Sequence, residues 1–467
     1  MEAYFQTRQD HWDAIAQKRD HWHGMGRWYH RRLIEIYQYL VNPNQRVLEI
    51  GCGMGSLLAH LHPSRGVGID FSAEMIARAK KRHPELEYYQ ADAHDLSGIE
   101  GEFDVIILSD TINDLWDVQL AFDQIRRLCT PHTRIIINFY SHLWQFPLTI
   151  AQSLNLAAPM LNQNWLTPED INNMLHLSGF ENIRTTREIL WPLPLGGLAN
   201  RYLVKLWPFN AFALSNFVIA RPEAQPTEQP SVSVVIAARN EAGNVKAIFE
   251  RVPKMGSRTE IVFVEGHSRD NTYETIADEI PLHPSTPSLL FRQPGIGKAD
   301  AIRLGFEKAT GDILMILDAD LTVPPEDLPR FYDAIVSGKG EFINGVRLVY
   351  PMEKEAMRTL NFIGNKLFSM TFSWLLGQPI KDTLCGTKVM WAKDYAEIAA
   401  NRSYFGDFDP FGDFDLIFGA AKLNRKIIDL PIRYRDRTYG TTNISRWKHG
   451  LLLLRMVAFA ARRIKFV

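Results

Sequence analysis

The feature that most constrains the fold is an alternation of apolar runs with helical stretches, which stops once and then begins again. Before residue 221, runs such as Arg46 to Ile50 alternate with helical patterns such as Ala73 to Arg82. Residues Arg221 to Pro230 (RPEAQPTEQP) carry three prolines and no hydrophobic periodicity, and the alternation resumes at Ser233. The sequence therefore predicts an α/β fold in two domains, residues 1–222 and 231–467, joined by a linker at 223–230.

Ligand sites are expected at the strand ends, because open α/β sheets bind ligands beyond the carboxyl ends of their parallel strands. The expected strands are Arg46 to Ile50, Val67 to Asp70, Val105 to Leu108, Arg134 to Phe139, Ser233 to Ala237, Glu260 to Glu265 and Asp312 to Asp318. The expected helices between them include Gln119 to Cys129, Glu241 to Val252 and Lys298 to Thr310.

Composition excludes several classes of protein. The formal charge of -1 removes whole-molecule attraction to nucleic acid. The three cysteines, Cys52, Cys129 and Cys385, are too few and too scattered for a zinc motif or a disulfide scaffold. The polar N-terminus contains no apolar stretch like a signal peptide. We therefore expect a cytoplasmic protein.

The first expected strand runs directly into a glycine-rich loop. The run Glu49-Ile-Gly51-Cys-Gly53-Met-Gly55 allows tight turns and a close approach of a ligand to the backbone. A dinucleotide fingerprint requires a third glycine where Ser56 stands, which argues against NAD. The next two strands end on Asp70 and Asp92, carboxylates suited to ribose hydroxyls and to an adenine amine, respectively.

This ordered series, followed by the run from Phe103 to Asp110, resembles the class I S-adenosylmethionine-dependent methyltransferases with a Rossmann-like fold. The resemblance covers roughly residues 10 to 222. It implies S-adenosyl-L-methionine as the cofactor, with the glycines at its methionine part, Asp70 at the ribose, Asp92 and Ala93 at the adenine, and Ser109 and Asp110 at the sulfonium. The implied cofactor-binding residues are Glu49, Gly51, Gly53, Gly55, Asp70, Asp92, Ala93, Ser109 and Asp110.

The sequence does not single out the residues that bind the methyl acceptor. Aromatic residues and histidines of an N-terminal helical segment can form a lid, and three polar residues follow the fourth strand. These candidates are Trp12, Trp22, His23, Trp28, Tyr29, His30, Asp110, Asn113 and Asp114. No base is selected from this set, because methyl transfer to an acceptor that is already nucleophilic needs positioning alone.

The second half contains a similar row of polar residues at strand ends. Asn240 and Glu241 follow one strand, and Glu265 ends the next. Gly297 and Lys298 then open a helix beside the expected position of a diphosphate. We expect these residues to border a nucleotide pocket.

The strand Ile313 to Leu317 leads into Asp318-Ala-Asp320. In extended geometry residues i and i+2 face the same side, so both carboxylates can converge on one hard cation. We therefore predict that Asp318 and Asp320 bind Mg²⁺ or Mn²⁺, which neutralises a diphosphate leaving group.

Taken together, these motifs resemble a family 2 glycosyltransferase of the GT-A fold over about residues 231 to 450. The stretch from Asp318 to Asp327 is most similar to the polyprenyl-phosphate glycosyltransferases, although Thr322 stands where that subgroup commonly has glutamine. The resemblance implies a UDP- or GDP-linked sugar donor and a polyprenyl phosphate or glycan acceptor. The implied nucleotide-sugar-binding residues are Ala237, Asn240, Glu241, Glu265, Gly297, Lys298, Asp300 and Asp318.

Further matches concern the acceptor and the base. Arg347 and Arg437 would surround phosphates, and the run Asp382 to Lys388 resembles an acceptor loop. Asp413 is the first candidate for a catalytic base, and Asp415, Asp407 and Asp409 compete with it. A lipid phosphate is already ionised and needs no base, whereas a sugar hydroxyl does.

The C-terminal region bears on membranes. The run Leu360 to Leu376 is apolar, and residues Arg446 to Val467 carry six Lys or Arg and no acidic residue. We expect a basic amphipathic segment lying at the inner face of a membrane and no membrane-spanning helix.

The sequence thus predicts a bifunctional enzyme, a methyltransferase joined to an inverting, metal-dependent glycosyltransferase. Two alternatives remain. The first half can be an NAD-dependent oxidoreductase fused to a glycosyltransferase, or the whole chain a non-catalytic nucleotide-binding scaffold.

Overall fold

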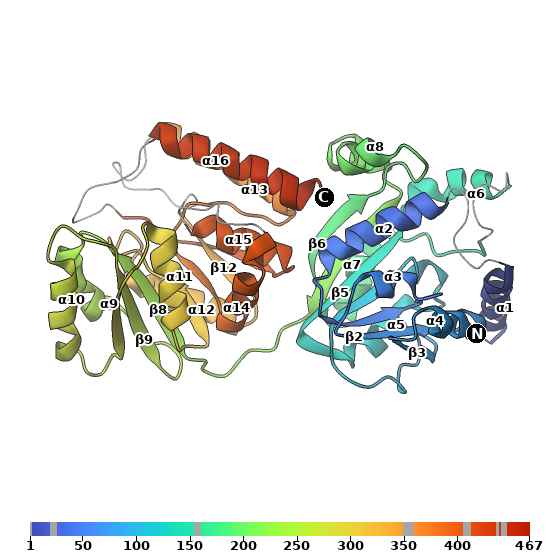
Figure 1. Ribbon diagram of the computed structural model, residues 1–467, viewed down its shortest axis with the longest axis horizontal. Helices are drawn as coiled ribbons and strands as arrows, with labels where there is room; N and C mark the ends of the chain where they lie inside the picture. The colour runs from blue at the N-terminus through green and yellow to red at the C-terminus, as the bar shows by residue number, and fades with distance from the viewer. Residues whose placement is uncertain are drawn as a thin grey trace. The chain divides into compact units, whose positions relative to one another are not determined.

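The computed structural model describes residues 2–18, 26–153, 160–347, 349, 359–404, 412–435, 439 and 446–467. The chain forms two compact units (Figure 1). Unit 1 comprises residues 1–223 with 466–467, and unit 2 comprises residues 224–465. Each unit is built around its own sheet.

Unit 1 is an α/β layer structure around a seven-stranded sheet of order β3-β2-β1-β4-β5-β7-β6. Its strands are β1 (Arg46–Ile50), β2 (Arg65–Asp70), β3 (Glu87–Gln90), β4 (Phe103–Ser109), β5 (Cys129–Tyr140), β6 (Phe180–Glu188) and β7 (Ser215–Pro222). Its helices are α1 (Glu2–Lys18), α2 (Gly26–Leu40), α3 (Ser56–His60), α4 (Ala73–Arg82), α5 (Val118–Arg126), α6 (Gln145–Ser153), α7 (Pro168–Leu177) and α8 (Gly197–Arg201), with short turns η1 (Ile112–Asp114), η2 (His142–Trp144), η3 (Leu203–Lys205) and η4 (Phe209–Phe212).

Both faces of this sheet are covered by helices. One apolar cluster joins the sheet to α2, α3 and α4, and a second joins it to α5 and α7. Burial on both faces explains why the central strands read as continuous apolar runs. The helices begin where local sequence dictates: the Ser72 hydroxyl accepts a hydrogen bond from the Met75 N–H at the start of α4.

Unit 2 has a seven-stranded sheet of order β10-β9-β8-β11-β13-β12-β14. Its strands are β8 (Val232–Ala238), β9 (Thr259–Glu265), β10 (Ser288–Arg292), β11 (Ile313–Ile316), β12 (Phe342–Val346), β13 (Lys388–Trp391) and β14 (Ile427–Pro431). Its helices are α9 (Val245–Arg251), α10 (Thr272–Glu279), α11 (Lys298–Lys308), α12 (Leu328–Val336), α13 (Thr359–Leu376), α14 (Ala392–Ala400), α15 (Asp413–Lys422) and α16 (Arg446–Ala460), with shorter turns η5 (Ala242–Asn244), η6 (Ile280–Leu282), η7 (Pro325–Asp327), η8 (Arg402–Tyr404) and η9 (Ala461–Lys465).

The predicted α/β class with a Rossmann-like first half and a GT-A-like second half is confirmed. The sheets are not wholly parallel, however. β7 runs antiparallel to both β5 and β6, and β13 runs antiparallel to β11 and β12. In the part of the chain that the structure describes, no helix combines the length and the apolar character needed to cross a bilayer.

Candidate functional site

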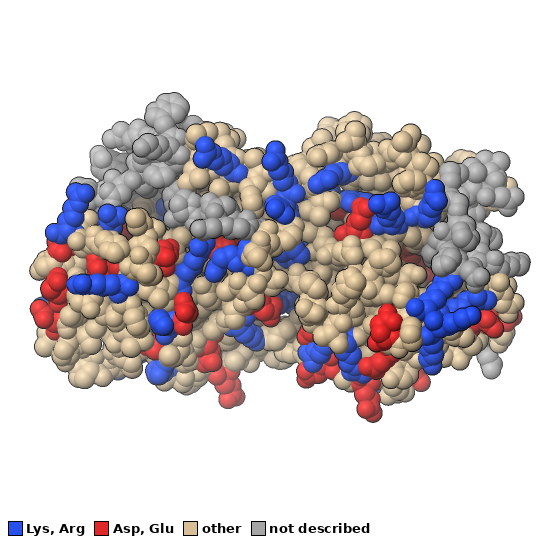
Figure 2. Space-filling model, viewed as in Figure 1, with Lys and Arg blue, Asp and Glu red and all other residues tan. Residues whose placement is uncertain are grey.

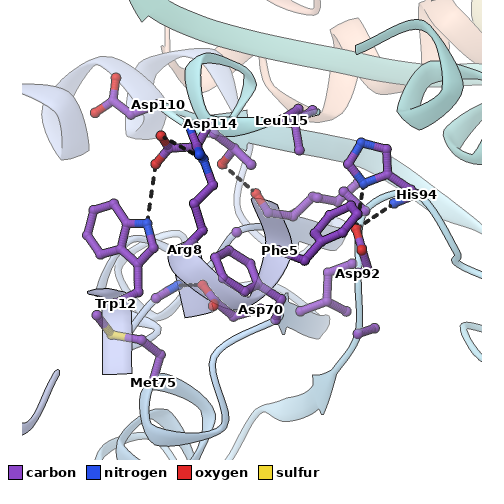
Figure 3. A pocket seen from close by; sticks show the side chains of 18 of the residues that line it. Phe5, Arg8, Trp12, Asp70, Met75, Asp92, His94, Asp110, Asp114 and Leu115 are labelled. Carbon is purple, nitrogen blue, oxygen red and sulfur yellow. Dashed lines mark hydrogen bonds and ion pairs between the residues drawn. The ribbon is translucent and has the colours of Figure 1, made fainter. Parts of the chain in front are cut away.

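The first candidate site is a cavity at the carboxyl edge of the unit 1 sheet. Strands β1 to β4 run parallel, so the residues that follow them meet at this edge. Seven of the nine residues predicted to bind the cofactor line the cavity: Gly51, Gly53, Asp70, Asp92, Ala93, Ser109 and Asp110 (Figure 3). The structure thus brings together residues that are up to about 60 positions apart in the sequence.

The glycine loop needs its glycines for two different reasons. Gly51 has φ +73°, and a Cβ atom there would lie 2.4 Å from Thr111 Oγ1, which leaves no room for a side chain. Gly53 has φ +51°, and a Cβ atom there would meet nothing within 4 Å. Because Gly53 lines the cavity, a ligand can approach its backbone closely.

Asp70 is held in place by the loops around it. Its carboxylate accepts hydrogen bonds from the backbone N–H groups of Gly53 and Ser72, each at 2.9 Å. Burial raises the pKa of Asp70 to about 6, and these two hydrogen bonds act in the opposite direction. The carboxylate is therefore fixed at the cavity wall, ready to accept hydrogen bonds from a ligand.

Asp92 is oriented by its neighbour His94. Asp92 Oδ1 lies 2.6 Å from His94 Nδ1 and accepts a hydrogen bond from the His94 backbone N–H at 3.0 Å. Burial acts to raise the pKa of Asp92, but the bonds from His94 bring it below its usual value. Asp92 therefore stays ionised at neutral pH.

Asp110 lies at the end of β4 in a polar cluster. It accepts hydrogen bonds from the Tyr29 hydroxyl at 2.8 Å and from Asn138 Nδ2 at 2.5 Å. Burial raises the pKa of Asp110 to about 7. A nearby positive charge would therefore shift Asp110 toward its ionised form at neutral pH.

Helix α1 supplies cavity residues that the sequence analysis missed. Phe5 and Arg8 line the cavity together with Trp12, which the sequence had indicated as part of a lid. Figure 3 shows Arg8 and Trp12 directed at Asp114; Arg8 Nε lies 3.6 Å and Trp12 Nε1 3.3 Å from its carboxylate. The apolar positions of α1 were a usable signal for Phe5, but nothing local indicated that Arg8 faces the cavity.

Two predicted residues lie behind the cavity wall. Glu49 is buried and accepts a hydrogen bond from the Leu58 N–H at 3.1 Å, and burial raises its pKa to about 8. Gly55 precedes α3 with φ +74°, and a Cβ atom there would collide with the Tyr88 hydroxyl. Both residues support the glycine loop and do not line the cavity.

The second candidate site lies at the carboxyl edge of the unit 2 sheet, around Asp318. Asp318 Oδ1 lies 2.6 Å from Lys298 Nζ. Lys298 is the first residue of α11. Lys298 lowers the pKa of Asp318, although burial opposes it. A Cβ atom on Gly386 would come within 2.5 Å of both groups, so the backbone at residue 386 packs directly against this ion pair.

Asp320 is bonded to the turn that contains it. The Thr322 backbone N–H and hydroxyl both donate to Asp320 Oδ1, at 3.1 and 2.8 Å. The extended geometry expected for these carboxylates is wrong, because β11 ends at Ile316 and the Leu321 N–H closes a turn onto the Asp318 carbonyl. Among the residues described, no cluster of three or more His, Cys, Asp or Glu side chains is placed to hold a metal.

The predicted donor-binding residues fall into two groups. Asn240 and Glu265 meet around one loop, because Ser268 bonds to both: its hydroxyl accepts from the Asn240 N–H at 3.0 Å, and its N–H donates to Glu265 at 2.5 Å. Glu241 is buried beside Asn244 and accepts from it at 2.7 Å. Ala237 belongs to β8 next to this loop.

The second group surrounds the start of α11. Gly297 precedes the helix with φ +99°. Asp300 accepts a hydrogen bond from the Gly295 N–H at 3.0 Å, so it closes the loop in front of Lys298. Lys298 points to the carboxyl edge, where it meets Asp318.

Arg347, predicted to bind a phosphate, is engaged by an aspartate. Its Nε and Nη2 atoms donate to the two Asp382 carboxylate oxygens at 2.8 and 2.9 Å. Asp382 is fully buried, and Arg347 lowers its pKa although burial opposes this. The pair joins β12 to the predicted acceptor loop and leaves only part of the guanidinium for a ligand.

The two candidates for a catalytic base are separated by the structure. Asp413 is buried at the first turn of α15, and its Oδ1 atom lies 3.6 Å from the buried Lys388 Nζ. Asp415 forms ion pairs with Arg402 at 2.9 Å and Arg303 at 3.3 Å. The ammonium of Lys298 also interacts electrostatically with Asp413, so Asp413 and Asp318 border one charged region. Several predicted residues lie outside the described part of the chain: Trp22, His23, Asp407, Asp409 and Arg437.

Each unit thus gathers polar and charged residues at the carboxyl edge of its own α/β sheet, around a cavity in unit 1 and around the Lys298–Asp318 pair in unit 2. Residues 41–179 match the family model of a methyltransferase domain. Residues 233–397 match the model of glycosyl transferase family 2. The chain therefore carries the domains of two different transferases, and the resemblance predicted from the sequence is confirmed.

Several curated relatives are glycosyltransferases by name. A dolichol-phosphate mannosyltransferase of Pyrococcus furiosus is 35% identical over 109 residues, 23% of this chain and 30% of its own. An undecaprenyl-phosphate 4-deoxy-4-formamido-L-arabinose transferase of Pectobacterium carotovorum is 31% identical over 219 residues, 46% of this chain and 63% of its own. The chain thus spans less than two thirds of these relatives.

Among solved structures, the N-methyltransferase NodS of Bradyrhizobium japonicum in complex with S-adenosyl-L-homocysteine is 14% identical, with a TM-score of 0.30. The match covers 42% of this chain and 88% of that chain.

Proposed function

We propose that this chain is a bifunctional transferase that moves a methyl group in unit 1 and a sugar in unit 2. The observation that carries the proposal is that each sheet has its own row of fixed carboxylates at its carboxyl edge. In unit 1 the row runs through Asp70, Asp92 and Asp110. In unit 2 it is centred on Asp318 beside Lys298.

The unit 1 cavity fits S-adenosylmethionine, whose sulfonium supplies an electrophilic methyl group. Asp70 is fixed by two backbone hydrogen bonds and can accept both ribose hydroxyls. Asp92 is held ionised by His94 and can accept the adenine amine. Asp110 gives the sulfonium an anionic partner in a buried environment, where a charge interaction is stronger than in water.

Unit 2 is proposed to transfer a sugar from a nucleoside diphosphate to a polyprenyl phosphate with inversion. Asn240 and Glu265 border the nucleoside position, and Lys298 faces the diphosphate from the N-terminus of α11. A polyprenyl phosphate is the acceptor that fits best, because its oxygen is already ionised and Asp413 need not remove a proton. The named relatives that act on dolichol phosphate and undecaprenyl phosphate support this choice.

The carboxylates of unit 2 fit a magnesium or manganese ion that is shared with the donor. Mg²⁺ is commonly bound by one or two carboxylates together with substrate phosphates, and Asp318 and Asp320 flank one turn. The Thr322 hydroxyl donates to Asp320 and holds this carboxylate in its turn. Such an ion would offset the charge of the leaving diphosphate.

Helices α13 and α16 support peripheral contact of unit 2 with a membrane. They pack together, and several of their apolar side chains are exposed, among them Met370, Trp374, Leu451 and Leu454. Arg462, Arg463 and Lys465 follow in η9, and the sequence from 446 to 467 contains no Asp or Glu. Exposed apolar and basic side chains on elements that contact one another are typical of segments at an anionic lipid interface.

Product analysis tests both activities. The full chain is incubated with nucleotide sugars, Mn²⁺ or Mg²⁺ and polyprenyl phosphates, and mass spectrometry detects a glycosylated lipid; labelled S-adenosylmethionine then reports methyl transfer. Asp318→Asn should abolish sugar transfer alone, and Asp70→Asn should weaken cofactor binding alone. Displacement of bound cofactor by NAD instead of S-adenosylhomocysteine would favour an oxidoreductase, and binding without any turnover would favour a scaffold.

A further inference from the structure

Unit 1 carries an apolar surface that neither its core nor its cavity explains. It is formed by η2 and α6 on one side and by α8, η3 and η4 on the other. Leu195, Trp207 and Phe146 are 98, 84 and 74% exposed, and Leu143, Leu198 and Phe212 are also exposed. We call these six side chains the aromatic patch. Soluble surfaces rarely leave so many large apolar groups together in water.

Buried side chains and hydrogen bonds fix the chain between β6 and β7, which carries part of the patch. Asn200 is buried and exchanges hydrogen bonds with the backbone of Trp191, at 2.7 and 2.6 Å. Val204 is fully buried, and Lys205 pairs with the buried Glu188. Trp144 Nε1 donates to the Phe212 carbonyl at 2.9 Å, which joins the two sides of the patch. The apolar side chains are therefore held outward by an ordered scaffold.

The segments that carry the patch follow strands that end at the same edge of the sheet as the cofactor cavity. Ser109, which lines the cavity, pairs with Asn138 near the end of β5. At that end Tyr140 pairs with Ser215, and Ser215 pairs with Glu188. The connections from β5 to α6 and from β6 to β7 both start there. A surface that covers the patch therefore lies at the same edge of the sheet as the cavity.

The charged residues near the aromatic patch indicate what kind of surface can cover it. Residues 141–153 contain no charged side chain, and residues 189–214 contain Arg201 and Lys205 but no Asp or Glu. In Figure 2 the region of unit 1 that carries α8 is mostly tan. Lys205 is paired with the buried Glu188, so Arg201 is the exposed charged side chain of residues 189–214. Exposed Trp, Phe and Leu side chains beside an exposed Arg match the interface of an anionic bilayer, where aromatic rings sit at the level of the headgroups.

We propose that the aromatic patch docks unit 1 on an anionic lipid bilayer and presents the cofactor cavity to methyl acceptors carried by membrane lipids. The docking stands on the surface alone, and the lipid-borne acceptor rests on the proposed methyl transfer. The patch belongs to unit 1, whereas α13 and α16 belong to unit 2.

The test uses the full chain and vesicles that contain phosphatidylglycerol. Hydrogen–deuterium exchange is measured with and without vesicles, and vesicle affinity is measured by co-sedimentation. Leu195→Ser with Leu198→Ser changes the patch. Leu177→Ser with Leu282→Ser makes the same chemical change at exposed positions of α7 and η6, outside the patch.

Vesicles should slow exchange in residues 191–212, and the patch variant should lose this protection and bind vesicles at least about tenfold more weakly. The control variant should behave as the unchanged chain. Protection confined to α13 and α16, or equal affinities of both variants, would overturn the proposal. Protection of the patch that grows with protein concentration in the absence of vesicles would also overturn it, because a second copy would then be the occupant. None of these readouts requires turnover, so they remain valid if methyl transfer is absent.

Discussion

Lys298 and Asp318 form an ion pair of 2.6 Å, and the backbone at Gly386 packs directly against it. The cation at the start of α11 and the carboxylate after β11 are thereby fixed opposite each other, at the point where a diphosphate would bind. The charged edge of unit 2 therefore depends on the absence of a side chain at residue 386.

Gly386→Ala should disrupt donor binding without unfolding unit 2. The new Cβ atom would lie 2.2 Å from Asp318 Oδ2 and 2.5 Å from Lys298 Nζ, so both side chains must move. Because both are ends of side chains that can rotate, the free energy of unfolding should fall by only about 1 kcal/mol. Affinity for a nucleoside diphosphate should fall at least about tenfold.

Calorimetry of nucleotide binding and thermal unfolding checks this expectation. Gly364→Ala is the matched control, since a Cβ atom there meets nothing within 4 Å. Donor affinity equal to that of the control would show that the ion pair plays no part in binding.

The charge of Asp110 should make S-adenosylmethionine binding depend on pH. Asp110 has its pKa raised to about 7, so it is largely neutral at pH 6 and ionised at pH 8. A sulfonium beside it favours the ionised form, whereas the thioether of S-adenosylhomocysteine carries no charge. The affinity ratio of the two ligands should therefore rise about three- to tenfold from pH 6 to pH 8.

Titration calorimetry with both ligands measures this ratio. Any pH-dependent effect of Asp70 acts on both ligands alike and therefore cancels in the ratio. Asp110→Asn keeps an oxygen acceptor for Tyr29 but removes the ionisation, so its ratio should not change with pH. A ratio that rises equally in the variant would place the sulfonium elsewhere.

Glu49 should destabilise unit 1 at alkaline pH. Its folded-state pKa is raised to about 8 by burial, from an ordinary value of 4.5. The folded state therefore holds this proton more tightly than the unfolded state, and stability is lost as the pH rises from about 4.5 to 8. Glu49→Gln retains an oxygen for the Leu58 N–H and should stabilise unit 1 by roughly 2–5 kcal/mol at pH 8.

Thermal unfolding of the unliganded chain at two pH values measures the effect. The stabilisation should be small at pH 5, where Glu49 is neutral in the folded state. Equal stabilisation at pH 5 and pH 8 would mean that Glu49 contributes through packing and not through its charge.

Substitution of Asp413 should leave turnover nearly unchanged, whereas substitution of Asp415 should lower the stability of unit 2. If the acceptor is a phosphate, Asp413→Asn should leave kcat within about tenfold, because no proton must be removed. Asp415→Asn should lower the free energy of unfolding by roughly 1–3 kcal/mol, because Arg402 and Arg303 lose an ionised partner. A loss of kcat by about 10³ in Asp413→Asn, with donor binding retained, would indicate a hydroxyl acceptor and a catalytic base.

The sequence predicted those parts of the fold and site that depend on local pattern. Asp70 and Asp92 could be placed at one edge, because parallel strands bring their carboxyl ends together. The reversal of β7 was not predicted, since an apolar run does not reveal the direction of a strand.

Contacts distant in the sequence also escaped prediction. Arg8 reaches the cavity because α1 packs over the sheet edge, which no local periodicity encodes. Arg347 is paired with Asp382, and the turn after β11 separates Asp318 from the extended strand. Each outcome depends on which partner the tertiary structure brings near a charged group.

The most direct measurement is a calorimetric titration of the full chain with S-adenosylhomocysteine and then with a nucleoside diphosphate and Mn²⁺, repeated for Asp70→Asn and Asp318→Asn. Asp70→Asn should lose affinity for the first ligand alone, and Asp318→Asn should lose affinity for the second alone. If both variants bind both ligands as tightly as the unchanged chain, the carboxyl edges of the two sheets are not the binding sites.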